Sequence, residues 1–527
     1  SYVKNTLDRD LVAFDFAATT ADDIKLTSLT VHCAVGTGAD CSDAFQSLNL
    51  YLKEGSTLTK LDGPESISSA GTDGDVDFSF THTIDAGNSA RLLVRGNVAS
   101  AAGAGTYLFT IEDDTDVTAE DSEGSDAVVN DGDGNYADAF VAVGPRTVTI
   151  AGNGSLSNQN ISDSSTVSRI LVGNSSMETV LRLRFAADEL EAWNVRKLQI
   201  KEINWGNDAD VEKVYLKWAD KEFSANLVGG LANFNLPSGS YINIPAGGNV
   251  TVDVLVDVGN VVPDSALTGD LPQFAFDFND NFEAVGASSS TVLAAAPSGA
   301  DINGESMRVA KSAPSVAHQA TSTSLSAGTV TLYKWTVTAD AAGDVAIKQF
   351  AFDVQPSAAL VASGVGNFKF FRNGVDVSSS SASVDIEESG GADLEAGNLA
   401  AAGTVLVKWS DAAGAGEEII GAGNTVTYEL RATVTGPTTG ESISTQLAND
   451  TAGDVGDIDT ATGGETVGEG VEVDGGASNL VWSDLSNTVQ GGGTTIHNGT
   501  LGASSFDWVD GFLVDGLSSI NTQVLSD

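Results

Sequence analysis

The sequence predicts an all-β protein built from three tandem antiparallel β-sandwich domains and a C-terminal tail. Two observations predict this class. The dominant residues are Gly, Ala, Ser, Thr, Asp and Val, a mixture typical of exposed strands and turns. One pattern of apolar residues also occurs three times along the chain with the same internal spacing. A chain of 527 residues has room for three or four domains of about 100 to 200 residues each.

The repeated pattern begins with an apolar residue that is followed, eight positions later, by a closely spaced apolar group. This first signature consists of Phe16, Ile24, Leu26, Leu29 and Val31 in the first copy, Phe185, Trp193, Val195, Leu198 and Ile200 in the second, and Val337, Val345, Ile347, Phe350 and Phe352 in the third. A second signature follows in the same order: Phe45, Leu48 and Leu50; Val211, Val214 and Leu216; Val365, Phe368 and Phe370.

The third signature is an Ile-x-Ala-Gly turn followed by a run in which apolar residues alternate with others. The turns are Ile84 to Gly87, Ile244 to Gly247 and Ile420 to Gly423, and the runs contain Leu92 and Val94, then Val252, Val254 and Val256, then Val426, Tyr428 and Leu430. Alternation places one face of a strand in a core. Several such strands per copy, separated by Gly, Asn, Asp and Ser turns, predict immunoglobulin-like two-sheet sandwiches.

One segment favours a helix by its own composition. Residues 185–197 contain several Ala, Glu and Leu residues, which have high helix propensity. The aligned segments of the other copies contain Thr-Thr or Gly-Asp instead. We therefore predict a strand, a loop and a second strand in all three copies.

The copies set the predicted domain boundaries at residues 1–142, 143–304, 305–478 and 479–527. Each copy ends with a Gly-containing turn and an extended run, after Gly144, Gly304 and Gly470. Long Ser-rich connectors precede the second and third copies and are long enough to supply an opening strand. Only Ser1 to Asp10 precede the first signature of the first copy, so we expect this domain to lack its first strand.

The tail of residues 479–527 contains apolar and aromatic residues that need a surface to bury them. Its candidate assembly residues are Leu480, Val481, Trp482, Phe506, Trp508, Phe512 and Leu513. A strand from this tail that fills the open first domain of another copy would give a head-to-tail homopolymer. Two alternatives stay open: the tail folds back on the third copy, or it makes a contact in a planar lattice.

The charge and the cysteines indicate an extracellular protein. The chain has 72 Asp and Glu against 25 Lys and Arg, a net charge of -47 that repels nucleic acid and anionic membranes. No apolar stretch is long enough to span a membrane, and we expect Ser1 to be a processing site or an artificial boundary. Cys33 and Cys41 flank a short loop and are candidates for a disulfide, although two unpaired thiols remain the alternative. Sequons at Asn153, Asn160, Asn174, Asn249, Asn449 and Asn498 fit the same setting.

No catalytic motif occurs in the sequence, and we expect no enzymatic activity and no organic cofactor. The four histidines, His32, His82, His318 and His497, are spread over the chain, and no nucleophile elbow, zinc motif or phosphate loop is present. Calcium is the one ligand that the sequence suggests. Asp131, Asp133, Asn135 and Asp138 place four oxygen donors on one short turn, with a solvated acidic turn as the alternative. A weaker candidate is the run Asp277, Asn279, Asp280 and Asn281.

The layout resembles the tandem immunoglobulin-like surface proteins of bacteria and archaea, which include surface-layer proteins and fibre subunits. The repeated signatures, the linker from Gly304 to Pro314 and the segment from Trp482 to Gly516 carry this resemblance. It implies a structural role and supplies no catalytic residues. A Leu-Pro-x-Thr-Gly sorting motif is absent, so covalent attachment to a cell wall is not expected.

The sequence therefore predicts a non-catalytic structural protein of the cell surface that assembles with copies of itself into an extracellular filament. A surface-layer subunit is the first alternative. An adhesin or glycan-binding protein is the second, because Trp193, Trp205 and Trp218 would stack on sugar rings if they were exposed.

Overall fold

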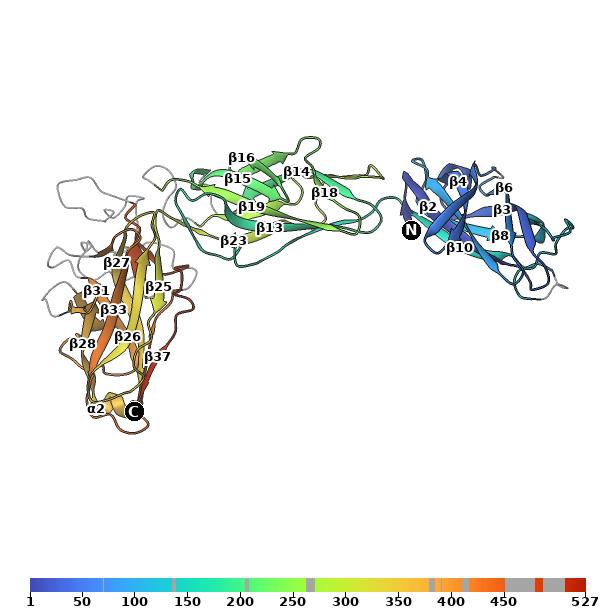
Figure 1. The fold of residues 1–527 in the computed structure, drawn as a ribbon. Helices are drawn as coiled ribbons and strands as arrows, with labels where there is room; N and C mark the ends of the chain where they lie inside the picture. Colours follow the sequence, from blue (N-terminus) through green and yellow to red (C-terminus); the bar gives the residue numbers. More distant parts are fainter. Residues whose placement is uncertain are drawn as a thin grey trace.

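The computed structural model confirms the all-β class and shows β-sandwiches that follow one another along the chain (Figure 1). It describes residues 1–69, 71–134, 139–203, 208–261, 271–378, 384–389, 391–409, 417–450, 479–486 and 508–527. Two short α-helices occur in this part of the chain, and none of its helices is long and apolar enough to cross a membrane. The segment from Glu178 to Glu202 forms a strand, a loop and a strand, as expected, and not a helix.

Domain 1 (residues 1–151) is a sandwich of two sheets. One sheet has the order β1-β10-β8-β3-β6, with β9 also on β3, and the other has the order β2-β7-β4-β5. The elements are β1 (Tyr2–Val3), β2 (Thr6–Ala17), β3 (Ile24–Thr37), α1 (Cys41–Ala44), β4 (Phe45–Glu54), β5 (Thr57–Glu65), β6 (Gly74–Ile84), β7 (Ser89–Val98), β8 (Gly105–Ile111), a 3₁₀ turn (Asp114–Asp116), β9 (Val117–Glu120) and β10 (Val143–Ala151).

Domain 2 (residues 154–309) repeats this plan with the sheets β11-β13-β19-β15-β16 and β22-β21-β14-β20-β23, the latter with β17 and β18 on β14. Its elements are β11 (Leu156–Asn160), β12 (Ile170–Val172), β13 (Glu178–Ala187), β14 (Trp193–Glu202), a 3₁₀ turn (Asp208–Asp210), β15 (Val211–Trp218), β16 (Lys221–Ala225), β17 (Leu231–Asn235), β18 (Ile242–Ile244), β19 (Asn249–Val258), β20 (Gln273–Asp277), β21 (Glu283–Gly286), β22 (Val292–Leu293) and β23 (Ile302–Ser306). The strand β24 (Arg308–Ala310) follows and pairs with β12.

Domain 3 (residues 310–527) has the sheets β25-β26-β33-β28-β29 and β30-β31-β27-β34-β37, with β32 and β35 also on β27. Its elements are β25 (Pro314–His318), β26 (Gly328–Ala339), β27 (Val345–Pro356), α2 (Ala358–Ser363), β28 (Val365–Arg372), β29 (Val375–Asp376), β30 (Val384–Glu388), β31 (Gly403–Trp409), β32 (Glu418–Ile420), β33 (Thr425–Val434), β34 (Ser442–Leu447), β35 (Leu480–Ser483), β36 (Trp508–Asp510) and β37 (Gln523–Ser526).

The three signatures occupy equivalent places in the three sandwiches. Phe16 of β2 pairs with Ala90, Phe185 of β13 pairs with Val250, and Val337 of β26 pairs with Val426. The Ile-x-Ala-Gly turns share one backbone geometry, because Gly87, Gly247 and Gly423 have φ angles of 77°, 67° and 67°. A residue with a β-carbon is disfavoured in this left-handed region, which explains why glycine recurs at this position.

The cores place two domain boundaries later than the sequence predicted. Val148 and Ile150 of β10 belong to the core of domain 1, and Met307 and Val309 belong to the core of domain 2. The predicted boundaries after residues 142 and 304 are therefore too early. The reason is that Gly144 and Gly304 lie within strands of the domains that they were expected to follow, and the run after each leads directly into the next domain.

The prediction that residues 479–527 form a tail separate from the third domain is wrong for the described residues, because they complete domain 3. Strand β35 pairs with β27, and β37 pairs with β34. These strands take the places of β9 and β10 in domain 1: Ile347 pairs with Trp482 where Leu26 pairs with Ala119. The third copy thus ends at β37 and not near residue 478. The extended run expected after Gly470 lies outside the described residues.

The residues assigned to the assembly tail are accordingly parts of a core or of its border. Leu480, Val481 and Trp482 are 0–1% exposed, while Phe512 and Leu513 are partly exposed. Phe506 lies outside the described residues, and Trp508 is placed by its backbone in β36. Of the three outcomes that the sequence left open, the fold-back on the third copy describes this chain.

Trp482→Ala tests whether the tail is integral to domain 3. The substitution leaves a large cavity and removes the bond from the indole Nε1 to the carbonyl of Asp510 (2.8 Å), so we expect domain 3 to lose about 3–5 kcal/mol of unfolding free energy. Chemical denaturation of the full chain measures this loss. The control is Val524→Ala on β37, whose side chain is 47% exposed and whose loss is expected to change little. Equal, small effects of the two variants would contradict the integral role.

Candidate functional site at the open edge of the first domain

The strand β2 of domain 1 lies at the edge of its sheet, whereas its counterparts in the other domains are interior. Strand β13 pairs with β19 on one side and β11 on the other, and β26 pairs with β33 and β25. Within domain 1, the sheet order starts at β2, which pairs only with β7. The main-chain groups on the other side of β2 therefore have no strand partner among the described residues, and such an edge readily accepts another strand.

The other domains define where a covering strand would lie. Asn158 of β11 stands opposite Phe185, and Val316 of β25 stands opposite Val337. Phe185 and Val337 both correspond to Phe16. A strand equivalent to β11 would therefore pair with residues 14–18 of β2. In domain 2 the covering strand also contributes Leu156 to the core, opposite Ala187.

The burial of the core follows the presence of the covering strand. In domain 2, Phe185 and Trp193 are fully buried. Their counterparts Phe16 and Ile24 in domain 1 are only partly buried at the border of the core. On the same strand, Leu7 is 65% exposed. Apolar surface is thus left accessible at this edge of domain 1.

Charged residues on β2 are held by arginines of the neighbouring strand β7. The Asp15 carboxylate accepts two bonds from Arg91 (2.6 and 2.7 Å), and Asp10 accepts one from Arg95 (2.7 Å). The hydrogen bond from Arg91 lowers the pKa of Asp15. Charges along an exposed strand hinder unspecific pairing of edges, so a partner strand has to be matched to this edge.

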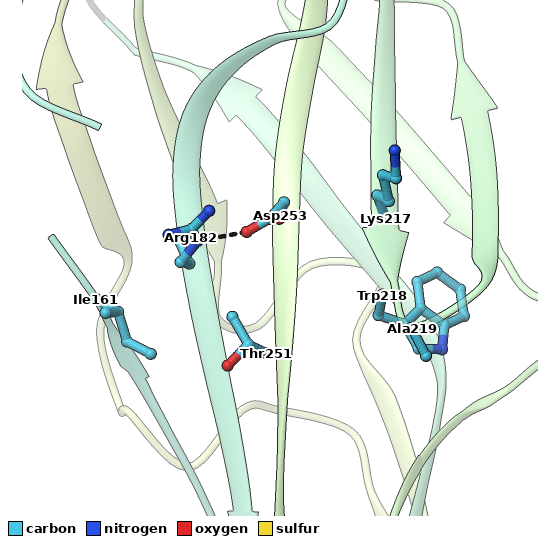
Figure 2. Close-up of a pocket in the computed structure, with 7 residues that line it drawn as sticks. All are labelled: Ile161, Arg182, Lys217, Trp218, Ala219, Thr251 and Asp253. Carbon is cyan, nitrogen blue, oxygen red and sulfur yellow. Dashed lines mark hydrogen bonds and ion pairs between the residues drawn. The ribbon is translucent and has the colours of Figure 1, made fainter. Parts of the chain in front are cut away.

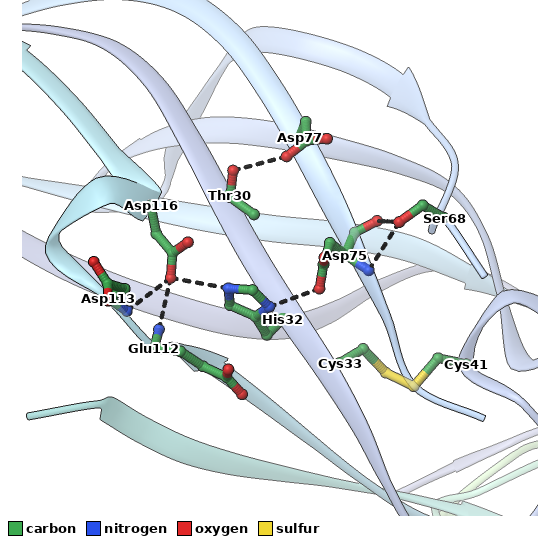
Figure 3. A network of polar contacts seen from close by, with 10 residues as sticks. All are labelled: Thr30, His32, Cys33, Cys41, Ser68, Asp75, Asp77, Glu112, Asp113 and Asp116. Atoms are coloured by element: carbon green, nitrogen blue, oxygen red, sulfur yellow. Dashed lines mark hydrogen bonds and ion pairs between the residues drawn. A yellow bond between two sulfur atoms is a disulfide. The ribbon is translucent and has the colours of Figure 1, made fainter. Parts of the chain in front are cut away.

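A histidine network stabilises the other sheet of domain 1 (Figure 3). The His32 ring nitrogens lie 2.6 Å from Asp75 (Nδ1) and 2.9 Å from Asp116 (Nε2). A neutral imidazole donates from one nitrogen only, so both contacts are hydrogen bonds only when His32 is protonated. Burial opposes this charge, but the two carboxylates outweigh it and raise the pKa of His32. Next to His32, Cys33 is joined to Cys41 in a disulfide, with Cα atoms 6.2 Å apart.

The outer face of domain 2 carries a shallow hollow of about 390 Å³ beside an ion pair between Arg182 and Asp253 (Figure 2). Lys217 and Trp218 also line it. Arg182, Asp253 and Lys217 come from the adjacent strands β13, β19 and β15 and alternate in charge, which is a cross-strand pairing that stabilises the sheet. The charge of Arg182 beside the hollow is therefore already compensated by Asp253.

Two of the three tryptophans on which the glycan-binding alternative depended are buried. Trp193 is fully buried, and Trp218 is 5% exposed and stacks on Phe223. Trp205 lies outside the described residues. The sequence left both readings open, because an aromatic residue on an alternating strand has the same pattern whether it faces a core or a ligand. The aligned apolar position of Trp193 already favoured the core.

The calcium candidates stay predictions. Asp131 and Asp133 lie on a turn in which Asp131 accepts bonds from the amides of Asp133 (3.2 Å) and Val141 (2.9 Å). Asn135 and Asp138 lie outside the described residues. In the weaker candidate, Asp277 is already engaged by Lys201 at 3.0 Å.

Domain 3 carries a partly buried carboxyl group among other acids. Burial raises the pKa of Glu395 to about 7, with a further contribution from the charges of Asp385, Asp393 and Asp376. Sequence reasoning missed this group, because Asp376 and Asp385 come from two different strands and meet the loop of Asp393 and Glu395 only in the folded, acid-rich domain.

Comparison with known proteins gives remote structural likenesses only. No family model matches the chain, and no curated protein matches it. Among solved structures, the C-terminal domain of the antigen I/II-family protein AspA of Streptococcus pyogenes aligns with a TM-score of 0.17 and 10% identity, over 56% of this chain and 95% of that one.

Two further alignments are with the E. coli adhesin CfaE (TM-score 0.20, 10% identity, 59% of this chain and 97% of that one) and with BcpA, the major pilin subunit of Bacillus cereus (TM-score 0.17, 7% identity, 80% and 88%). These TM-scores are too low to assign a family or a function to this chain. The strand pairing within each domain establishes the sandwich architecture.

His32 predicts a pH dependence of domain 1. Because its pKa is raised on folding, its contribution to stability is complete below the unfolded value of about 6.5 and is lost as the pH rises through the folded pKa. We therefore expect the stability advantage of the wild type over His32→Gln to be larger at pH 5 than at pH 9. Thermal unfolding of both proteins across this range measures it. A difference that is constant with pH would refute the assignment.

Glu395 predicts a second pH dependence, in domain 3. A carboxyl group whose pKa is raised on folding destabilises the folded state as the pH rises from its unfolded value to about 7. Glu395→Gln is therefore expected to stabilise domain 3 at pH 8 and to have little effect at pH 4. The matched control is Glu305→Gln, since Glu305 is exposed at the end of domain 2. A variant that is less stable than the wild type at pH 8 would contradict this account.

Proposed function

We propose that this protein is a non-catalytic structural subunit of the cell surface that assembles with copies of itself. In this proposal a strand of a second copy is added to the edge of β2, which gives an extracellular filament by head-to-tail strand exchange. The observation that carries the proposal is the one-sided pairing of β2, together with the partial exposure of Phe16 and Ile24 at the place that β11 and β25 cover in the other domains.

Strand addition satisfies two requirements of this edge at once. The added strand gives hydrogen-bond partners to the free side of β2, and its inward side chains cover the accessible apolar surface. A heterologous contact of this kind extends into a filament unless its rotation closes a ring. The surface-layer alternative uses the same edge in a planar arrangement, and electron microscopy of assembled material distinguishes the two.

The described tail strands are not free donors. Strands β35 and β37 are paired within domain 3, so they would have to leave their own sheet to reach another copy. The proposal therefore places the donor in a segment of the second copy other than these two strands. Cross-linking from a cysteine introduced at Ala13 on β2, followed by mass spectrometry, identifies that segment.

Two general features support an extracellular setting. The Cys33–Cys41 disulfide is of a kind that persists in oxidising environments. A net charge of -47 keeps single subunits apart unless a specific contact joins them.

Three consecutive domains with large cores and long paired strands also suit a protein that spans distance rather than one that transforms a substrate.

A self-complemented variant tests the proposal. In the alignment of the first signature, Ile170 corresponds to Ser1, so a copy of residues 153–169 placed directly before Ser1 should lay the β11 sequence along residues 14–18 of β2. We expect this variant to remain monomeric and domain 1 to gain roughly 2 kcal/mol from the added apolar burial. Light scattering and electron microscopy over a range of concentrations compare it with the wild type, which is expected to polymerise.

The control carries the same extension with Lys at the position of Leu156 and Pro at the position of Asn158. This strand can neither fill the apolar place nor pair fully, so polymers should persist. If the self-complemented variant polymerises as the wild type does, or if the wild type is monomeric at every concentration, the proposed assembly at β2 is wrong.

A further inference from the structure

The strand β24 between domains 2 and 3 is shared by both cores. Along a strand, alternate side chains point to opposite sides. Met307 and Val309 belong to the core of domain 2, whereas Ala310 belongs to the core of domain 3. All four residues from Met307 to Ala310 are fully buried, including Arg308. The connection is therefore not a solvent-exposed linker.

Arg308 is held by the C-terminal segment of domain 3. Its Nη2 donates to the carboxylate of Asp510 (2.7 Å), and both side chains are 0% exposed. Its Nη1 donates to the backbone carbonyls of Asp510 (3.0 Å) and Phe512 (2.9 Å). The guanidinium carbon also lies 5.4 Å from the centre of the Phe512 ring. Trp482 donates to the same Asp510 carbonyl, which ties this segment to the core of domain 3.

The backbone around Arg308 is bound on both sides. On the side of domain 2, the amide of Arg308 donates to the carbonyl of Arg169 (3.0 Å), and β24 pairs in parallel with β12. On the side of domain 3, the amide of Lys311 donates to Asp484 (2.6 Å), and its ammonium group donates to the carbonyl of Leu485 (3.0 Å). The chain is therefore fixed to domain 2 at Arg308 and to domain 3 at Lys311, and a change of angle between the domains has to separate the Arg308 side chain from Asp510.

The junction between domains 1 and 2 has no comparable lock among the described residues. The strand pairing of β1 with β10 places Thr149 and Ala151 where Arg308 and Ala310 stand, and both are partly exposed. Gly152 and Asn153 are exposed. Contacts across this junction include a hydrogen bond of 3.3 Å from the side-chain amide of Asn5 to the carbonyl of Ser288, at an exposed position.

A buried ion pair is costly to desolvate, so its main effect is on geometry rather than on net stability. Removing one partner leaves an uncompensated buried charge, which penalises any arrangement that separates the two. We propose that Arg308 and Asp510 lock domains 2 and 3 into one rigid body, and that the chain bends between domains 1 and 2, at residues 151–153. This inference does not depend on the proposed assembly at β2.

Distance distributions in the full chain test the lock. The two native cysteines are joined in a disulfide, so labels attach to introduced cysteines. One doubly labelled protein carries Glu222→Cys and Val375→Cys, which are exposed in domains 2 and 3, and a second carries Glu54→Cys and Glu222→Cys, exposed in domains 1 and 2. We expect a narrow distribution for the first pair and a broad one for the second. Equal widths in the wild type would overturn the proposal without any further variant.

Substitutions then identify the cause of the rigidity. Arg308→Met and Asp510→Asn are each expected to broaden the distribution between domains 2 and 3. They should also lower the hydrogen-exchange protection of the amides of residues 308–311 by about 100-fold. The matched control is Lys408→Met, which breaks the partly exposed ion pair with Glu387 in domain 3. It is expected to leave the interdomain distribution unchanged.

Hydrogen exchange in β14 and β27 separates loss of the lock from loss of folding. Protection in these central strands should persist in both variants, because they lie within the cores of their own domains. If both variants keep the narrow distribution, or if Lys408→Met broadens it equally, the Arg308–Asp510 pair is not the lock.

Discussion

The need to pair the main chain of every strand that lies over a core determines most of this structure. A strand with a buried face and an open edge leaves unpaired amide and carbonyl groups beside apolar surface, and both are satisfied by adding one more strand. Strand β11 does this for β13, and β25 does it for β26. The same requirement draws β35 and β37 from the far end of the chain onto β27 and β34. Within the described residues, β2 of domain 1 lacks the covering strand that its counterparts β13 and β26 have.

The repeat was predictable because its residues occupy core positions or turn positions, and each of these restricts which amino acids can stand there. Phe16, Phe185 and Val337 recur at one register position, and the glycines of the Ile-x-Ala-Gly turns recur because their φ angles are positive. The end of the third domain was not predictable in this way. Its closing strands are separated by long insertions, from Leu447 to Leu480 and from Ser483 to Gln523, so that their spacing no longer matches the other copies. A completed domain therefore looked like a domain followed by a tail.

The polar sites were harder to predict than the fold, because their partners are distant in sequence. His32 lies on an outward position of β3 between carboxylates from β6 and from the turn before β9. Arg308 interrupts an apolar run, which on local evidence indicates an exposed side chain, yet it is buried because Asp510 stands against it. In a chain with so many acids, no local signal distinguishes the carboxylate that pairs from those that are solvated. The Cys33 and Cys41 pair was accessible to sequence reasoning because only a short loop separates the two residues.

The two junctions and the open edge together assign different mechanical roles to the domains. A partner strand on β2 would fix domain 1 to a neighbour through many main-chain bonds, and the exposed connection at Gly152 and Asn153 would then be the compliant point of each subunit. Domains 2 and 3 would move together as one rigid body, because the residues that close domain 3 also bind Arg308. The same segment therefore helps to close the last sandwich and holds its junction with the middle one. An assembly of such subunits would bend once per subunit, between its first and second domains, and its stiffness would depend on the integrity of the C-terminal strands.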